Sequence, residues 1–255
     1  MKITKEYIDM KINNLKLYLF VALIIATTSL KAQDLLIGVS GGGATFGMNS
    51  TKEFNKVLIK VLPFTPILKE DFPPWIFSKA EVLYCLPKNL ALGLTFTSTS
   101  TGSRYALSDY SGSYKFDNIQ KGLFPGIKVL FGKAPGTSNG INAAFEAGVA
   151  FSSMTIKENL TISTEPTSDK SDLKAMGFFI QPGVYYFHVI NQKIRLSANL
   201  SYYYGIEKGY HLPGNKDQQL INTETNKQVK PQWDLIRVGI SAFMNLRKTT
   251  KNKMK

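Results

Sequence analysis

The sequence predicts an all-β fold, an eight-stranded antiparallel up-and-down transmembrane β-barrel, on three observations. First, apolar residues alternate with small or polar ones in several runs, most clearly from Ile141 to Phe151. Side chains alternate faces along a strand, so each run has one apolar face and one polar face. Second, these runs reach the roughly 9–11 residues that a tilted strand needs to cross a bilayer, whereas a strand of a soluble protein is typically about 5–6 residues long. Third, the connections between the runs alternate between short and long.

The alternating segments follow one another from residue 35 onward. We place the eight strands at 35–47, 75–86, 90–100, 114–131, 140–156, 174–189, 194–206 and 233–246. The connections are short at 87–89, 132–139 and 190–193, and long at 48–74, 101–113, 157–173 and 207–232. Outer-membrane barrels have short periplasmic turns and longer extracellular loops. A lipocalin-like soluble barrel would carry its apolar residues inside and would not require this difference in loop length, so the membrane barrel is favoured.

Two prolines lie inside predicted strands. Pro125 and Pro182 each remove a backbone donor from the strand ladder. Both are followed by glycine, so we expect a β-bulge or a tight bend at each position.

Residues 1–32 have the composition of a secretory signal peptide. An apolar run from Leu17 to Leu30 follows Lys11 and Lys16, and Ala32 supplies a small residue for cleavage. An uncleaved membrane anchor is the alternative, but the run is short of the roughly 20 apolar residues that a helical span needs. Met10 would give a more ordinary signal length and is an alternative start. We therefore expect a signal peptide at 1–32, a barrel at 33–247 and a basic tail at 248–255.

The chain is strongly basic, with a formal net charge of +13. A basic balance can indicate nucleic-acid binding, but the lysines are scattered over 52–60, 227–230 and the tail rather than gathered into a stripe. For an exported chain we expect outer-membrane lipid, not nucleic acid, as the partner of these residues. Cys85 is the single cysteine, so the sequence predicts no internal disulfide, no cysteine-based metal site and no cofactor.

Aromatic residues fall near the ends of the predicted strands. Amphipathic rings favour the headgroup level of a bilayer, so these residues are expected to form girdles at the two interfaces. The predicted girdle comprises Trp75, Tyr84, Phe96, Tyr114, Phe131, Phe151, Tyr186, Tyr202, Tyr204 and Trp233.

The face opposite the apolar one carries the charged residues of the strands. They are Lys79, Glu81, Lys128, Glu146, Arg195 and Arg237, together with the polar Gln181. An eight-stranded barrel is just wide enough to be filled by side chains, and enclosed charges must be paired because isolated ones are costly. We expect Glu81 and Glu146 to pair with these lysines and arginines. The network is interpreted as a plug that closes the lumen; a gate or a narrow anion path is the alternative.

The first long connection contains a second signal. Phe54, Val57, Leu58, Val61 and Leu62 follow the spacing of an amphipathic helix. Such a helix would lie on the outer leaflet, fold over the barrel mouth or bind a partner. The alternation of Val57, Ile59 and Val61 fits an extended strand nearly as well.

Several segments resemble one family of membrane proteins. The signal ending Lys31-Ala32-Gln33, the glycine-rich first strand around 38–43 and the segments 122–127 and 177–186 are similar to those of the small outer-membrane β-barrel proteins common in Bacteroidota. The architecture of that family is that of OmpA- and OmpX-type barrels. The resemblance implies a Gram-negative outer-membrane location with both termini in the periplasm, and it implies no single activity. Many members end on an aromatic residue in the last strand, whereas this chain continues to Lys255, so Phe243 and Leu246 are candidates for an internal assembly signal.

A catalytic site has little support in the sequence. The two histidines are His188, expected at the inner interface, and His211, in a long loop four residues after Glu207. No serine lies in a Gly-x-Ser-x-Gly context, and Gly41–Gly43 lacks the Lys-Ser/Thr that follows a phosphate-binding loop. We predict a monomeric structural or surface-binding protein that is not an enzyme, with another envelope protein as a candidate partner of loops 48–74 and 207–232. The alternatives are a narrow pore, a component of a transport or secretion machine, and a lipid-modifying enzyme.

Overall fold

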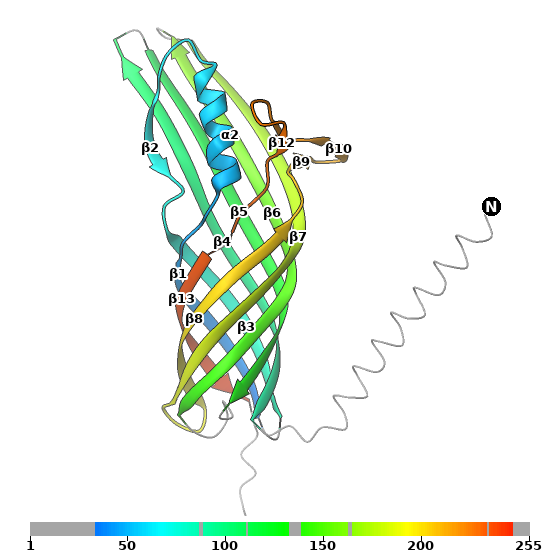
Figure 1. The fold of residues 1–255 in the computed structure, drawn as a ribbon. Helices are drawn as coiled ribbons and strands as arrows, with labels where there is room; N and C mark the ends of the chain where they lie inside the picture. Colours follow the sequence, from blue (N-terminus) through cyan, green and yellow to red (C-terminus); the bar gives the residue numbers. More distant parts are fainter. Residues whose placement is uncertain are drawn as a thin grey trace, which may run out of the picture.

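The computed structural model describes residues 34–86, 89–110, 112–132, 139–162, 165–233 and 235–246. The predicted signal peptide at 1–32 and the predicted tail at 248–255 lie outside these ranges. Both ends of the described chain, Asp34 and Leu246, lie at the end of the barrel that carries the short connections (Figure 1).

Eight long strands form a closed ring in which each strand is antiparallel to its two neighbours. The ring follows the chain order and closes between the first and last strands. Alternate exposed apolar residues cover its outer face. The predicted eight-stranded up-and-down transmembrane barrel is therefore confirmed. The strands of the ring are β1 (Asp34–Ala44), β3 (Trp75–Leu86), β4 (Leu90–Asp109), β5 (Gly112–Gly132), β6 (Gly140–Ile162), β7 (Glu165–Val189), β8 (Ile194–Glu207) and β13 (Leu235–Asn245).

Glycines in the first strand allow close packing where the ring closes. A Cβ on Gly38 would lie 2.3 Å from the ring of Phe243, and a Cβ on Gly42 would lie 2.0 Å from the carbonyl oxygen of Val238. Because Phe243 and Val238 belong to β13, these glycines let the last strand and its inward ring approach the first strand.

Four strands are longer than the sequence indicated. The predicted loops at 101–113 and 157–173 are wrong, because β4 pairs with β5 as far as Asp109↔Gly112 and β6 pairs with β7 as far as Ile162↔Glu165. Beyond the apolar belt, the band of exposed apolar residues around the ring, the inner face of these strands mixes apolar with polar residues. The simple alternation in the sequence is therefore lost while the backbone pairing continues. These extended parts of β4–β7 pair with one another and rise beyond the closed ring (Figure 1). We call this part of β4–β7, beyond Thr99 on β4 where the pairing with β3 ends, the outer sheet.

The two prolines do not produce bulges. The register of β5 with β6 is the same at Leu123↔Phe151 and at Gly126↔Gly148, on either side of Pro125. The register of β7 with β8 is likewise unchanged across Pro182. Of the two expected alternatives, a bulge or a tight bend, the bulge is therefore wrong: each proline lacks an N–H donor, but no extra residue enters the strand.

The first long connection forms a helix rather than an extended strand. Helix α2 (Asn49–Lys60) is followed by β2 (Ile67–Asp71), which pairs with β4. The expected apolar face is largely correct, with Phe54 and Val57 buried, but Val61 follows the helix and is 77% exposed. Among the described residues, no helix has the length and apolar character needed to cross a membrane.

The last long connection is built from two small hairpins. One of them lies beside the middle of β7, where Lys174 pairs with His211. The hairpins are β9 (His211–Leu212) with β10 (Asn215–Gln219), and β11 (Ile221–Asn222) with β12 (Lys227–Gln228).

Candidate functional site

The barrel interior contains a cluster of four charged residues from three strands. Lys79 and Glu81 come from β3, Lys128 from β5 and Glu146 from β6, and all four are buried. The Lys79 ammonium donates to Glu146 at 2.5 Å and lies 3.9 Å from Glu81. On the other side of the cluster, the Lys128 ammonium donates a hydrogen bond to Glu81. The structure thus brings these predicted residues together with each carboxylate bound to a lysine.

Hydroxyl groups and a ring complete this cluster. Thr95 donates to Glu146 at 2.8 Å and Ser40 donates to Glu81 at 2.7 Å. The Lys128 ammonium also lies 3.6 Å from the centroid of the Tyr185 ring, within cation–π range. Hydrogen bonds to charged groups offset part of the cost of removing them from water.

Arg237 lies in the same interior, where its hydrogen-bond partner is an amide rather than any glutamate of the described ranges. One guanidinium nitrogen donates to Gln181 at 3.0 Å. The guanidinium carbon lies 4.5 Å from the ring centroid of Tyr203 and 5.0 Å from that of Phe124. Arg237 is therefore held by an amide and two aromatic faces, and it joins the charge cluster to an aromatic layer above it.

Arg195 lies apart from the cluster. It is buried near the end of the barrel with short connections, and its guanidinium donates to Asp34 at 3.1 Å. Asn245 donates to the same carboxylate at 2.8 Å. The expectation that Arg195 would pair with Glu81 or Glu146 is wrong, because Arg195 enters the barrel at the start of β8, level with the start of β1.

An aromatic layer fills the interior on the side of Arg237 that faces the outer sheet. Phe124 is at its centre and makes edge contacts with Phe179, Tyr203 and Trp233, with ring centroids 5.1–5.9 Å apart. The Trp233 indole donates to Ser152 at 2.8 Å and is 1% exposed. Its predicted place in the aromatic girdle is therefore wrong: Trp233 precedes β13 and its ring turns into the barrel mouth.

A second apolar layer lies on the opposite side of the charge cluster. It is formed by inward residues near the short connections, including Leu83, Leu130, Phe187 and Phe243, and it contains the buried thiol of Cys85. The charged cluster is thus enclosed between an aromatic layer and an apolar layer.

Helix α2 covers the inner face of the outer sheet (Figure 1). Its buried polar residues bind side chains of β4 and β5: Asn55 donates to Ser103 at 2.7 Å and accepts from Asn118 at 2.9 Å. Gln120 donates to Thr51 at 2.9 Å and accepts from Tyr210 at 2.7 Å. The helix, the sheet and the last long connection are therefore held in one hydrogen-bonded unit.

The tyrosines of this unit are buried, and Tyr114 is one of them. It is 4% exposed and packs edge-on against Phe64, 5.0 Å between centroids, so its predicted girdle position is wrong. Tyr114 faces inward on the outer sheet, beyond the apolar belt. Burial, with a hydrogen bond to Glu158, raises the pKa of Tyr114, and burial near Glu207 raises the pKa of Tyr210.

The other predicted girdle residues lie on the outer face. Seven of them are 45–54% exposed and Tyr84 is half-buried. The seven are Trp75, Phe96, Phe131, Phe151, Tyr186, Tyr202 and Tyr204.

The candidate catalytic groups do not assemble. His211 Nδ1 lies 2.9 Å from the carbonyl oxygen of Leu212, and Glu207 accepts from Tyr203 at 3.2 Å. His188 is exposed on the outer face of β7, near the short connections. Within the described ranges, no group of three or more His, Cys, Asp or Glu residues is placed to hold a metal ion.

Sequence reasoning missed Asp34, the hydroxyl partners of the glutamates and the inward aromatic residues. Asp34, Ser40 and Thr95 carry no distinctive motif, and their role depends on which strands lie opposite. The aromatic layer did have a signal: Phe124 shares the inward parity of Lys128, and Phe179 shares that of Gln181.

No family model and no curated protein matches the chain. Among solved structures, it is similar to the N-terminal β-barrel domain of Pseudomonas aeruginosa OprF, at 13% identity and TM-score 0.29, covering 85% of this chain and 100% of that one. It is also similar to Ail, the attachment invasion locus protein of Yersinia pestis, at 9% identity and TM-score 0.31, covering 83% and 94%. A third is Neisserial surface protein A, at 10% identity and TM-score 0.30, covering 84% and 97%. At these values the likeness adds nothing to the strand pairing, on which the assignment of the fold rests.

Proposed function

We propose that this protein is an outer-membrane barrel with a closed lumen, which anchors the outer sheet and helix α2 at the cell surface for a structural or binding role. The observation that carries this proposal is the pairing of an apolar outer face with a filled interior. The exposed apolar residues of the ring suit a lipid environment. The charge cluster between two apolar layers suits a plug.

The outer sheet supplies the surface for binding. A largely apolar hollow of about 400 Å³ lies at its tip, lined by residues such as Phe64, Leu107, Tyr114 and Ile162. Exposed apolar surface far from the belt suits contact with another protein. We place a partner of this class, an envelope or surface protein, at the tip and at the connections 48–74 and 207–232.

A narrow anion path is the second candidate. Arg237 favours it, because its guanidinium adds a positive charge to a cluster of two lysines and two glutamates and its Nη2 has no hydrogen-bond partner among the described residues. The aromatic layer above Arg237 argues against free passage, since Phe124 and Tyr203 pack directly on its guanidinium.

Two measurements on the full-length protein test the proposal. Heat-modifiable migration of the protein from an outer-membrane fraction is expected, because a folded barrel and its heated form differ in mobility. In planar bilayers the folded protein should give no discrete conductance steps, while a trimeric porin in the same bilayers serves as the positive control. Anion-selective steps would replace the closed-lumen proposal with the anion path, and soluble periplasmic protein without a mobility shift would contradict membrane insertion itself.

A further inference from the structure

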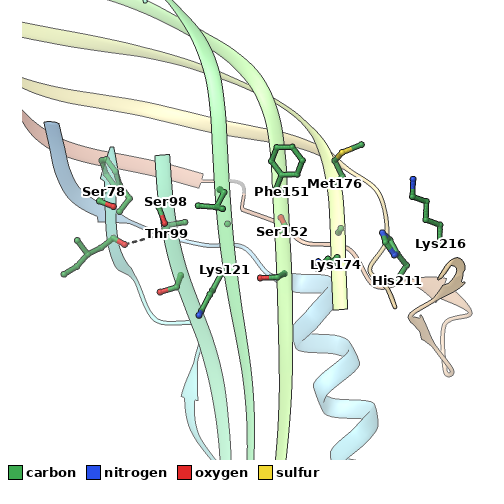
Figure 2. A pocket seen from close by; sticks show the side chains of 17 residues that line it. Ser78, Ser98, Thr99, Lys121, Phe151, Ser152, Lys174, Met176, His211 and Lys216 are labelled. Carbon is green, nitrogen blue, oxygen red and sulfur yellow. Dashed lines mark hydrogen bonds between the residues drawn. The ribbon is translucent and has the colours of Figure 1, made fainter. Parts of the chain in front are cut away.

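A hollow of about 820 Å³ crosses the outer face of the barrel where the apolar belt meets the outer sheet. Its walls come from β3, β4, β5, β6 and β7, with His211 and Lys216 at one end (Figure 2). The outward side chains Lys121, Phe151, Lys174 and Met176 are exposed, so the hollow opens outward rather than into the lumen.

The strand register divides this hollow into an apolar row and a basic row. The apolar row runs across β5, β6 and β7, where Leu123 pairs with Phe151 and Phe151 pairs with Met176. Two residues further from the belt, Lys121 pairs with Ser153 and Ser153 pairs with Lys174. The rows lie side by side on one face, because residues two apart on a strand point the same way.

The basic row has no acidic counterpart among the described residues that line the hollow, since none of them is Asp or Glu. Within the described part of the chain, no carboxylate pairs with Lys121, Lys174 or Lys216. Lysines elsewhere on the outer sheet differ: Lys115 pairs with Asp117 at 3.1 Å and Lys170 with Asp172 at 2.7 Å. The hollow is therefore a local excess of positive charge.

The spacing of the two central lysines suits a tetrahedral anion. Lys121 and Lys174 lie two strands apart, which is about 10 Å at the usual interstrand distance. Both side chains are long and flexible and can lean toward Ser153, which lies between them in the row. Each ammonium carries three donors, and a phosphate carries the acceptor oxygens to bind both.

We propose that this hollow binds a phosphorylated lipid of the outer leaflet. The phosphate lies over Ser153 between Lys121 and Lys174, and the acyl chains run down the belt along Leu123, Phe151 and Met176. The apolar row selects a lipid over a free anion, and the basic row selects a phosphate head over a zwitterionic one. This inference rests on the membrane placement proposed above, because the hollow lies at headgroup level only if the belt lies in the bilayer.

The test compares two lipids that share acyl chains and differ in headgroup. The full-length protein, folded in neutral detergent and verified by its mobility shift, is titrated with dilauroyl phosphatidic acid or dilauroyl phosphatidylcholine, and bound lipid is counted by native mass spectrometry. We expect phosphatidic acid to bind at least about tenfold more tightly. The Lys121→Gln, Lys174→Gln double variant should lose about 10- to 30-fold of that affinity, on the basis of roughly 1 kcal/mol for each lysine near a charged lipid surface.

A matched variant controls for net charge. Lys69→Gln with Lys157→Gln removes two exposed lysines outside the hollow and should leave phosphatidic acid binding within about twofold. Equal binding of the two lipids by the folded barrel, or equal losses in the two double variants, would overturn this inference and leave the closed barrel standing. Displacement by inorganic phosphate as readily as by phosphatidic acid would also overturn it, because the apolar row would then have no role. Failure to fold in detergent at all would count against membrane insertion instead.

Discussion

At the scale of single residues, the interior depends on Lys79, which lies between two carboxylates. Its ammonium is 2.5 Å from Glu146 and 3.9 Å from Glu81, and Lys128 binds Glu81 from the other side. Burying charges is costly unless each is paired, and removing one partner costs more than replacing the pair with apolar residues. The cluster should therefore be far more sensitive to single substitutions than to paired ones.

Glu146→Gln is expected to lower the free energy of unfolding by about 3 kcal/mol or more, because the buried Lys79 then shares Glu81 with the buried Lys128. The paired variant Lys79→Met, Glu146→Leu should lie within about 1 kcal/mol of wild type. Urea unfolding of the folded protein in detergent, followed by gel mobility, measures both.

The control for this experiment is an exposed ion pair. Lys60 and Glu224 lie 2.9 Å apart at the surface, and Lys60→Gln should change stability by less than about 1 kcal/mol. A Glu146→Gln variant as stable as the Lys60→Gln variant would show that the interior charges do not depend on one another.

The alternation of side chains along a strand explains which residues could be assigned to the lumen from the sequence alone. A strand alternates strictly, so the inward position of Lys79, Glu81, Lys128 and Glu146 follows from the apolar residues beside them. Which base meets which glutamate could not be predicted, because Lys79 and Glu146 meet across the lumen from strands that are not neighbours in the ring. The girdle positions were predicted from nearness to strand ends rather than from parity, which is why Tyr114 and Trp233 were misplaced.

At the scale of elements, helix α2 is bound through both apolar and polar residues. Phe54 packs with Met154 and Tyr210, while Asn55 bonds to Ser103 and Asn118. The sequence did not decide between a helix and a strand for this segment, because Val57 and Val61 fit both the helical spacing and the alternation of a strand. The choice depends on Thr51 and Asn55, whose polar partners are on β4 and β5 and cannot be found from the local pattern.

Phe54→Asp is expected to detach α2 from the outer sheet, at a cost of about 3–5 kcal/mol for the lost aromatic packing and the buried carboxylate. Hydrogen exchange read by mass spectrometry should show faster exchange over residues 49–60, with the strands of the closed ring unchanged. Lys56→Asp, on the exposed side of the same helix, is the control and should leave the exchange slow. Unchanged exchange in the Phe54→Asp variant would mean that the helix is held mainly by its polar contacts.

At the scale of the whole molecule, the closed ring and the outer sheet have separate supports. The ring closes through β1–β13 and β8–β13 pairing, whereas the outer sheet adds only the upper parts of β4–β7. The fold class, the eight strands and the short turns were predictable, because membrane thickness and side-chain alternation leave a strong pattern. The extension of the sheet was not, since solvent on the outer face and a polar helix contact on the inner face remove that pattern.

A shortened β6–β7 hairpin tests this separation. Replacing residues 158–169 with Asn-Gly joins the strands next to the Lys157↔Lys170 pair with a turn that suits a two-residue hairpin. We expect the variant to keep its heat-modifiable mobility, since the paired residues of the ring are untouched, while losing the hollow at the tip that Leu160 and Ile162 help to line. Loss of the mobility shift would show that the outer sheet is required for the ring to form.

The length of β6 has a consequence for what the protein can touch. Beyond Phe151, at the edge of the belt, the strand continues to Ile162. At about 3.3 Å per residue, those eleven residues measure about 36 Å before tilt is considered, which is comparable with the roughly 30 Å of the bilayer core. In the membrane placement proposed above, a large particle such as another cell or an antibody would therefore meet the tip of this protein before it reached the lipid surface.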